Sequence, residues 1–461
     1  DKLILLAVSL LWLCCQSSDN TAEVRPPNVL FISIDDLRPQ LGCYGDSIVQ
    51  TPNIDKLAAR GILFENAYTQ YALCGPSRAS FLTGYYPRAI GINDLNVHFR
   101  ENKPNAITLP QLFKENGYHS AGMYKVFHVV GFDPALFGNM DDPTSWSEPL
   151  WIPTKSAWGP VGDSIYQQSK AACLSKGPIG YGRIPRSFAL EAPEISDDQL
   201  GDGEMARAAI ERLRKMKDQP FFLALGFYHP HLPFVAPKKY WDLYSEEDLQ
   251  LPTNQYLPKD APPFVALNTR ELRSYPDIPN EGVFTKRLKK RLLHGYLASI
   301  SYVDAQVGIV LDELSRLGLE DNTIIVLLGD HGYQIGEHDH WCKKHCNFEE
   351  ATKVPLILSI PQIGRQETRI SSFVELVDIY PTLAQLCNLI PPADLDGKSL
   401  IPAIDRPSEM VFNTAISSYI MGGYTGTSLR TSQYRFTEWQ GSIDTKYELY
   451  DHTVDPDENI N

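Results

Sequence analysis

Long apolar runs alternate with amphipathic segments along most of this chain. Residues 28–34, 220–227 and 323–328 are continuous apolar stretches, rich in β-branched and aromatic side chains. Strands that are buried on both faces have this composition. Residues 204–216 and 292–317 instead carry apolar side chains at helical spacing. The alternation predicts an α/β fold, with a mostly parallel sheet flanked by helices on both faces.

The pattern changes at several places. Residues 131–200 and 251–285 are rich in Pro, Gly and Ser, and we expect long insertions there over the active face of the sheet. After residue 404 the chain has only short strand-like runs. We therefore predict a catalytic domain over 28–403 and a smaller C-terminal α+β subdomain over 404–461.

The first residues resemble an export signal. Lys2 precedes about a dozen mostly apolar residues, a run too short for an ordinary membrane span. Because position 1 is Asp, we expect the true start to lie upstream. Cys14 and Cys15 are either a bacterial lipoprotein site or plain signal residues. We expect a leader over 1–16 and a polar tether over 17–27.

The location of the protein follows from the same leader. The sequence contains no Asn-x-Ser/Thr sequon. For an exported protein this favours the bacterial periplasm, an outer-membrane lipoprotein or a secreted protein over a lysosomal glycoprotein.

Charge and cysteine content narrow the class of protein. The 42 Lys and Arg residues against 56 Asp and Glu residues give a net charge of −14, which argues against a nucleic-acid binder. A local basic cluster for a small anionic substrate is still compatible with this charge. The odd number of cysteines outside the leader and position 74 gives no complete disulfide framework. Cys342 and Cys346 are close enough in sequence to be either bonded or free.

Cys74 stands before a predicted helix. Pro76 and Ser77 open a helix-forming run, and Gly84 closes it. Cys74 should therefore lie at a helix N-terminus, where free N–H groups favour an anion.

Acidic side chains follow two of the predicted strands. Asp35 and Asp36 come after residues 28–34, and Asp330 with His331 comes after 323–328. Ligands of open α/β sheets bind beyond the carboxyl ends of the strands. Three converging carboxylates need a cation, and oxygen ligands suit Ca²⁺, with Mg²⁺ as the alternative. The nitrogen of His331 is a less usual ligand for such an ion.

The motif Cys74-Gly75-Pro76-Ser77-Arg78, followed by Ala-Ser-Phe-Leu-Thr-Gly, resembles the maturation signature of type I sulfatases. The chain further resembles the iduronate-2-sulfatase branch of that family, which also has His at the position of His331. That resemblance covers most of the chain and rests on residues 35–39, 41–45, 122–128, 141–147, 230–234, 336–338 and 341–343. The family's usual closing phrase resembles residues 448–456, so we expect a final segment to be missing.

The resemblance implies an alkaline-phosphatase/sulfatase-like fold and a role for each matching residue. A formylglycine-generating enzyme would convert Cys74 to formylglycine, whose hydrate is the nucleophile. Arg78 and Lys125 would stabilise the hydrate and the sulfate charge. His231 and Lys343 would bind sulfate, one of them protonating the leaving oxygen, and His128 would take a proton from the second hydroxyl. The implied metal ligands are Asp35, Asp36, Cys74 after conversion, Asp330 and His331. Candidate sugar contacts, with surface charges as the alternative, are Arg100, Asp142 and Lys344, the last standing where the human-type enzyme has an aromatic residue.

The sequence thus predicts an exported carbohydrate sulfatase with a bound divalent metal. The expected substrate is a 2-O-sulfated uronic acid or a related sugar of a sulfated polysaccharide such as a glycosaminoglycan. Two alternatives remain at this point. One is a phosphatase, phosphodiesterase or phosphonate hydrolase of the alkaline-phosphatase superfamily, and the other is a non-catalytic protein that binds sulfated glycans.

Overall fold

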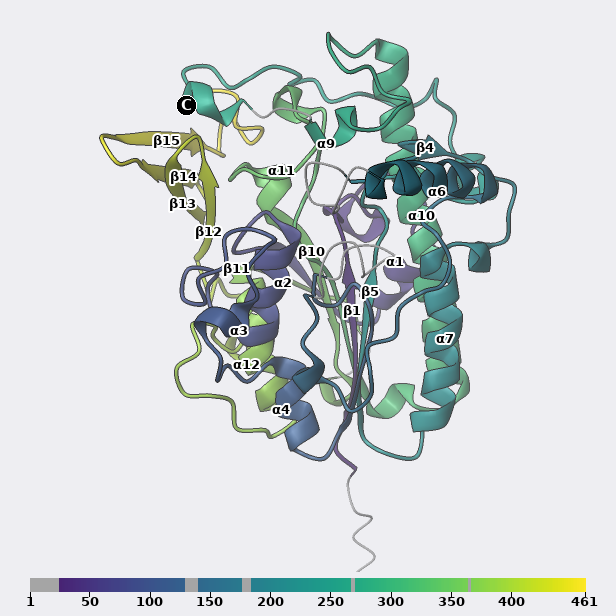
Figure 1. The fold of residues 1–461 in the computed structure, drawn as a ribbon. Coiled ribbons are helices and arrows are strands. Elements are labelled where there is room, and N and C mark those ends of the chain that lie inside the picture. Colours follow the sequence, from purple (N-terminus) through teal and green to yellow (C-terminus); the bar gives the residue numbers. More distant parts are fainter. Residues whose placement is uncertain (1–24, 129–139, 176–183, 267–269, 364–365) are drawn as a thin grey trace, which may run out of the picture.

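A seven-stranded sheet forms the centre of the molecule (Figure 1). The computed structural model describes residues 25–128, 140–175, 184–266, 270–363 and 366–461. The strand order is β11-β2-β10-β7-β1-β5-β3. In that order the strands are Thr368–Glu375, Ile62–Tyr68, Lys353–Ser359, Thr323–Gly329, Asn28–Ile34, Phe221–Phe227 and His119–Tyr124.

The three predicted buried strands lie side by side. β1 runs parallel to both β5 and β7, and its last residue, Ile34, pairs with Phe227 and Gly329. All residues of these three strands are buried. β10 is antiparallel to both of its neighbours, so the sheet is mixed but mostly parallel. The shared register brings the carboxyl ends of β1, β5 and β7 to the same end of the sheet. The predicted site residues follow these strand ends.

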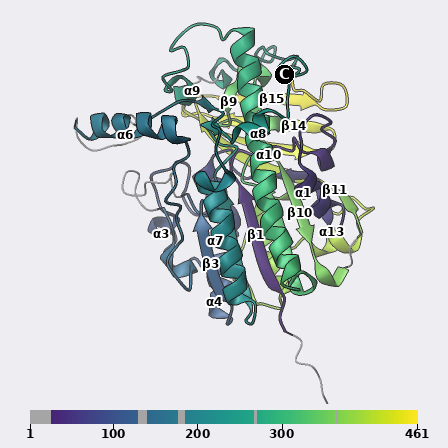
Figure 2. The same cartoon turned by 90° about the vertical axis from the view of Figure 1, so that its right-hand side faces the viewer.

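Helices cover both faces of this sheet (Figures 1 and 2). Leu30 and Ile32 of β1 belong to one apolar core, and Val29 and Phe31 belong to the other. Alternate side chains of a strand point to opposite faces, so each core needs its own helical layer. The first core is covered by α1 (Pro52–Ala58), α7 (Gly201–Met216) and α10 (Lys286–Arg316), and the second by α2 (Cys74–Thr83), α4 (Leu109–Glu115) and α12 (Ile379–Leu386).

The C-terminal part is a four-stranded antiparallel sheet with strands in chain order. Its strands are β12 (Thr414–Met421), β13 (Tyr424–Thr431), β14 (Tyr434–Gln440) and β15 (Thr445–Asp451). The predicted α/β class with a smaller C-terminal unit is confirmed. The exact boundary at residue 404 stays a prediction.

Shorter elements decorate the two main sheets. The 131–200 stretch, expected to be an insertion, contains the helix α6 (Pro160–Leu174), which projects from the body of the molecule (Figure 2). The remaining short helices and strands are α3 (Phe99–Asn102), α8 (Lys238–Trp241), α9 (Arg270–Arg273), α11 (Glu349–Thr352), α13 (Ile401–Asp405), β4 (Leu190–Glu191), β6 (Phe234–Val235), β8 (Gln334–Ile335) and β9 (Trp341–Lys343).

The structure bears differently on the expected leader and on the expected pairing of two cysteines. The leader, with Cys14 and Cys15, and most of the tether lie outside the described residues. Within the described ranges, every helix is too short or too polar to cross a membrane. Cys342 and Cys346, left open above, are both free thiols.

Candidate active site

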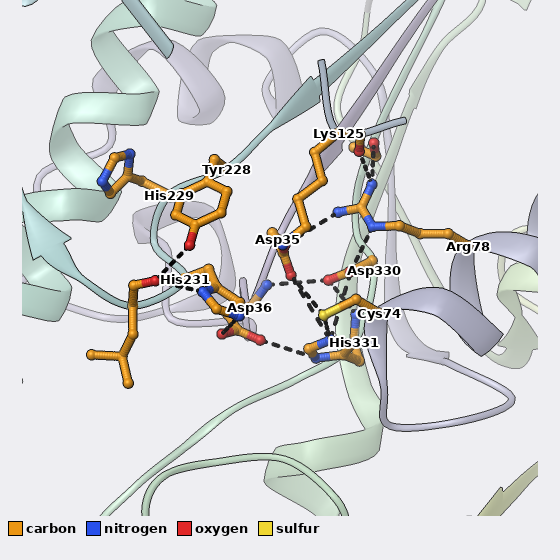
Figure 3. A network of polar contacts seen from close by, with 12 residues as sticks. Asp35, Asp36, Cys74, Arg78, Lys125, Tyr228, His229, His231, Asp330 and His331 are labelled. Atoms are coloured by element: carbon orange, nitrogen blue, oxygen red, sulfur yellow. Dashed lines mark hydrogen bonds and ion pairs between the residues drawn. The ribbon is translucent and has the colours of Figure 1, made fainter. Parts of the chain in front are cut away.

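The polar residues that follow β1 and β7 meet at one edge of the sheet (Figure 3). The backbone N–H of Asp36 donates to Oδ1 of Asp330 over 3.1 Å. The N–H of His331 donates to the same oxygen over 2.9 Å. The carboxylate of Asp330 thus holds together the backbone at the ends of β1 and β7. The sequence predicted that these two strand ends would lie close together.

Cys74 is the first residue of α2, which therefore begins at Cys74 rather than at Ser77. The side chain is 2% exposed. Its thiol donates to Oδ1 of Asp35 over 3.3 Å, and Sγ lies 3.2 Å from Nε2 of His331. Burial, assisted by the nearby charge of Asp35, raises the pKa of the thiol well above its ordinary value. The thiol is therefore protonated and is a poor nucleophile as it stands.

Four buried side chains form a group that could hold a metal ion. One potential ligand atom each from Asp35, Cys74, Asp330 and His331 lies within 4.8 Å of the others. The predicted ligand Asp36 lies beside this group but not in it. Its Oδ1 accepts from Nζ of Lys344 over 2.7 Å, and its buried Oδ2 accepts no hydrogen bond from the described residues. A carboxylate-rich pocket with an unused oxygen fits a divalent cation.

Three buried cations balance these carboxylates. Arg78 donates from Nε to Oδ2 of Asp330 over 2.9 Å and from Nη1 to Oγ of Ser33 over 3.1 Å. Lys125, just after β3, forms an ion pair with Oδ2 of Asp35. Lys344 pairs with Asp36 as described.

The pKa values of the three carboxyls separate as a result. Burial opposes the charge of Asp35, but Lys125, His231 and Arg78 outweigh it and hold its pKa well below the usual range. Burial raises the pKa of Asp36 well above its ordinary value, and Lys344 offsets this only in part. Burial also raises the pKa of Asp330 to about 7. A cation bound among them would favour the charged form of all three carboxyls.

His128 lies beside the helix start of Cys74. A Cβ placed on Gly75 would come within 3.7 Å of the Cβ of His128. Both ring nitrogens of His128 are buried and have no hydrogen-bond partner among the described residues. Burial and the charge of Lys125 lower its pKa well below the ordinary value. This imidazole is neutral and is free to accept a proton.

His231 reaches the site from the loop that follows β5. Its Nδ1 lies 2.7 Å from the carbonyl of Leu232, which assigns the proton to Nδ1 in the neutral ring. Nε2 then faces the site, 3.9 Å from Oδ2 of Asp36 and 3.8 Å from Oε1 of Glu271. Burial, with Lys344 and Lys125 nearby, lowers the pKa of His231 to about 3.

The two neighbouring lysines take different positions. Lys344, a candidate sugar contact, lies against the carboxylates with its ammonium on Asp36. Its assignment to the sugar stays a prediction. Lys343 is buried at the end of β9. Burial lowers the pKa of Lys343, and the charge of Glu271 opposes this shift.

Arg100 and Asp142 contact each other rather than the cluster of Asp35, Asp36 and Asp330. The guanidinium forms two bonds with the carboxylate of Asp142, of 2.6 and 2.7 Å. Its remaining donors reach carbonyls of Pro104 and Ala106 and the side chain of Gln111. Their assignment as sugar contacts stays a prediction.

Sequence reasoning missed several polar residues of this region. Glu271 of α9 faces His231, and Ser33 of β1 receives Arg78. Asp202, in the first turn of α7, binds His229 with 2.6 Å between Oδ2 and Nδ1. A single serine in a strand or an acid in a helical first turn is an ordinary structural residue in sequence, so no local signal marked them.

Comparison with solved structures identifies proteins with a similar fold. The phosphonate monoester hydrolase of Agrobacterium radiobacter superposes with a TM-score of 0.73 at 22% identity, covering 94% of this chain and 91% of that one. This similarity concerns the fold alone, and it agrees with the predicted alkaline-phosphatase-like architecture.

Sequence similarity is more specific. The family model described as Sulfatase matches residues 27–389, and the model described as N-sulphoglucosamine sulphohydrolase, C-terminal, matches residues 336–461. Iduronate 2-sulfatase of Homo sapiens is 34% identical, covering 90% of this chain and 85% of that protein. A protein named Sulfatase from Formosa agariphila is 34% identical, covering 99% of this chain and 87% of its own. The chain belongs to the sulfatase family and is a sulfuric ester hydrolase that resembles iduronate 2-sulfatases.

Proposed function

We propose that this enzyme is an exported carbohydrate sulfatase that acts through a formylglycine at position 74 and a divalent cation. The observation that supports this most directly is the position of Cys74. Cys74 is the first residue of helix α2, and its buried thiol contacts both Asp35 and His331. The cation is Ca²⁺, with Mg²⁺ as the alternative, held by Asp35, Asp36, Asp330, His331 and the converted residue 74.

The converted residue supplies a hydrate hydroxyl as nucleophile, and the cation supplies Lewis-acid charge stabilisation. The chain's own residues orient these groups. Arg78 is fixed by Asp330 and Ser33, so its guanidinium can stabilise charge without reorganising. Lys125, paired with Asp35, adds a second positive charge on the same side.

Proton transfer falls to His128 and to Lys343. His128 is neutral because burial lowers its pKa, so it is suited to take the proton of the second hydroxyl. His231 and Lys343 are the residues we propose beside the sulfate group. Of the two, Lys343 is the proposed proton donor to the leaving sugar oxygen, because Nε2 of the neutral His231 ring carries no proton. The lowered pKa of Lys343 makes its ammonium a stronger acid than an exposed lysine.

The substrate we propose is a 2-O-sulfated uronic acid or a related sugar of a sulfated polysaccharide. The identity of 34% to a protein named iduronate 2-sulfatase over 90% of the chain supports it. Arg100, Asp142 and Lys344 are the residues proposed near the sugar, and the maturation enzyme is the proposed partner. Export rests on the apolar run of residues 3–13. A lipid anchor at Cys14 or Cys15 is one outcome of that export.

The test of the chemistry is the variant Cys74→Ala. We expect turnover of sulfated sugars to fall by roughly 10³-fold or more, because the nucleophile is lost. The thermal unfolding temperature should change little, since the thiol is a small side chain at a pocket. Sulfate release from a panel of sulfated disaccharides measures the first effect, and circular dichroism measures the second. Cys173→Ala, in the projecting helix α6, is the matched control. Retained turnover in Cys74→Ala would refute the mechanism.

Removal of divalent ions tests the metal. Dialysis against a chelator should abolish turnover, and added Ca²⁺ should restore it, because the proposed cation would supply the Lewis-acid stabilisation of the charge on the sulfate group. Full activity of a metal-free preparation would contradict the metal's role. An aryl phosphonate assayed in parallel distinguishes the sulfatase from a phosphonate hydrolase on the same fold.

A further inference from the structure

A second group of ionisable side chains lies outside the active site, where the catalytic domain meets the end of the chain. It consists of His338 in the turn η6 (Glu337–Asp339), Glu350 in α11 and Glu458 after β15. One potential ligand atom of each lies within 4.8 Å of the other two. Glu458 is far in sequence from His338 and Glu350, so the fold alone brings it to them.

His338 is the unusual member of this group. Its side chain is 0% exposed, and neither ring nitrogen has a hydrogen-bond partner among the described residues. Nε2 faces Oε2 of Glu350 over 4.0 Å, too far for a direct hydrogen bond. Oε2 of Glu350 has no hydrogen-bond partner there either. Buried polar groups are normally paired, so two facing but unpaired ligand atoms point to a species between them.

The charge of this region is also unbalanced. Glu337 pairs with Arg38, and Glu458 pairs with Arg435. Glu350 has no Lys or Arg within ion-pair distance among the described residues, and its one such neighbour is His338. Burial and the charges of Glu337 and Glu458 raise the pKa of Glu350 well above its ordinary value. An ionised Glu350 would therefore need one more positive charge beside it, which a cation would supply.

A neighbouring group shows the contrast. Glu349, His452 and Glu458 also lie within 4.8 Å of one another. There, Arg430 and Arg435 both bond Glu349, so guanidinium groups already provide the positive charge. That group is an ordinary salt-bridge network and needs no ion.

The group around His338 is also accessible from outside. Glu350 is 20% exposed and lines a cleft of about 410 Å³, together with Arg38, Tyr44, Glu337, Glu349 and Lys353. An ion could reach Glu350 through this cleft, and an entry path is one requirement of a metal site.

We propose that His338, Glu350 and Glu458 bind a divalent transition-metal ion such as Zn²⁺, which fastens residues 337–350 to the C-terminal segment. One imidazole nitrogen and two carboxylate oxygens are a donor set that suits Zn²⁺ or Mn²⁺ better than Ca²⁺. Water from the cleft would complete the coordination. This site is separate from the active-site cation and does not depend on it.

The experiment is a Zn²⁺ titration of the full, metal-stripped protein with excess Ca²⁺ present to occupy the active site. Calorimetry and elemental analysis should find one Zn²⁺ per chain in the wild type, with a rise in the unfolding temperature. Glu350→Gln and His338→Gln should each bind Zn²⁺ at least tenfold more weakly and lose that rise. Glu247→Gln changes an exposed acid outside the group and should behave as the wild type does.

Three results would overturn the proposal. These are no Zn²⁺ uptake by the wild type, equal uptake by both variants, and uptake without any change in the unfolding temperature. The first would indicate that a water molecule, and not a metal ion, lies between His338 and Glu350. If one variant does not fold, the wild-type titration and the other variant still decide. Glu350→Gln should still release sulfate in a Ca²⁺-dependent way. A failure of the zinc site can therefore be distinguished from a failure of the proposed function.

Discussion

Asp202 is a buried carboxylate that fixes the start of the loop carrying His231. It accepts from the backbone N–H groups of Tyr228 (2.8 Å) and His229 (3.0 Å) and binds Nδ1 of His229. The hydroxyl of Tyr228 in turn donates to the carbonyl of Leu232 over 2.8 Å. A chain of hydrogen bonds thus runs from helix α7 to the residues on either side of His231. We infer that Asp202 positions His231 without touching substrate.

The variant Asp202→Asn tests this positioning role. The amide keeps one acceptor oxygen, but its two N–H donors would face the N–H groups that Asp202 now binds. We therefore expect a loss of about 2–3 kcal/mol in the free energy of unfolding. A displaced His231 should lower kcat by roughly 10²-fold. Urea unfolding and steady-state kinetics on an aryl sulfate measure both. Asp218→Asn, an exposed acid after α7, is the control. Wild-type kcat in Asp202→Asn would show that the loop does not depend on this carboxylate.

Single residues were predictable where their signal is local in sequence. Cys74 was identified because its motif and helix start are contiguous, and Asp35 and Asp330 because each directly follows an apolar strand. Lys343 and Lys344 are adjacent, and only the three-dimensional path of the chain decides which ammonium meets Asp36. The contacts of Asp202 likewise depend on the packing of α7 against β5, which no local pattern encodes.

Helix α1 shows how an element is completed by a distant one. Thr51 precedes the helix, but its side chain makes no capping bond. Its oxygen instead accepts from the N–H of Gly42 over 3.0 Å. Asp304, in the middle of α10, accepts from the N–H groups of Asn53 and Ile54 and so caps α1. The start of α1 thereby depends on the packing of α1 against α10.

Asp304 should make stability depend on pH. Burial raises its pKa to about 6, above the ordinary 3.8. The folded protein therefore holds this proton more tightly than the unfolded chain, and this contribution is present at low pH and lost as the pH rises through 6. Between pH 7 and pH 4, the free energy of unfolding of the wild type should gain roughly 2 kcal/mol over that of Asp304→Asn. Urea unfolding at both pH values checks this, and parallel pH profiles for the two proteins would contradict it.

Elements were predictable where composition is uniform. β1, β5 and β7 are apolar throughout and were found within a residue or two of their ends. β10 was missed because Pro355 interrupts it, and proline is unusual inside a sheet. In the structure the register of β10 with β2 shifts between Val354 and Leu356, so the proline sits at an irregularity. Its antiparallel insertion between β7 and β2 follows from the chain path and could not be read from composition.

At the scale of the whole molecule, a partly buried carboxylate joins the two sheets. Glu349 of α11 accepts from the hydroxyl of Tyr68 on β2 over 2.9 Å. It also forms ion pairs with Arg430 and Arg435 of the C-terminal sheet. Burial opposes the charge of Glu349, but Arg435 outweighs it and holds the pKa well below the usual range. The change of pattern after residue 404 predicted a separate subdomain, but the link was not predictable because its partners lie 81 or more residues apart.

Arg435→Met tests how strongly this link holds the C-terminal sheet. The guanidinium is 1% exposed and pairs with both Glu349 and Glu458. Removing it takes from the buried Glu458 its only paired guanidinium among the described residues and leaves Glu349 with one guanidinium, that of Arg430, so we expect a loss of about 3–5 kcal/mol in the free energy of unfolding. Arg435→Lys should recover only part of this, because a single ammonium cannot reproduce the fork geometry. Arg406→Met removes an exposed pair with Glu409 and should cost less than about 1 kcal/mol. If urea unfolding shows equal losses for Arg435→Met and Arg406→Met, the two sheets are held together by apolar packing rather than by this carboxylate.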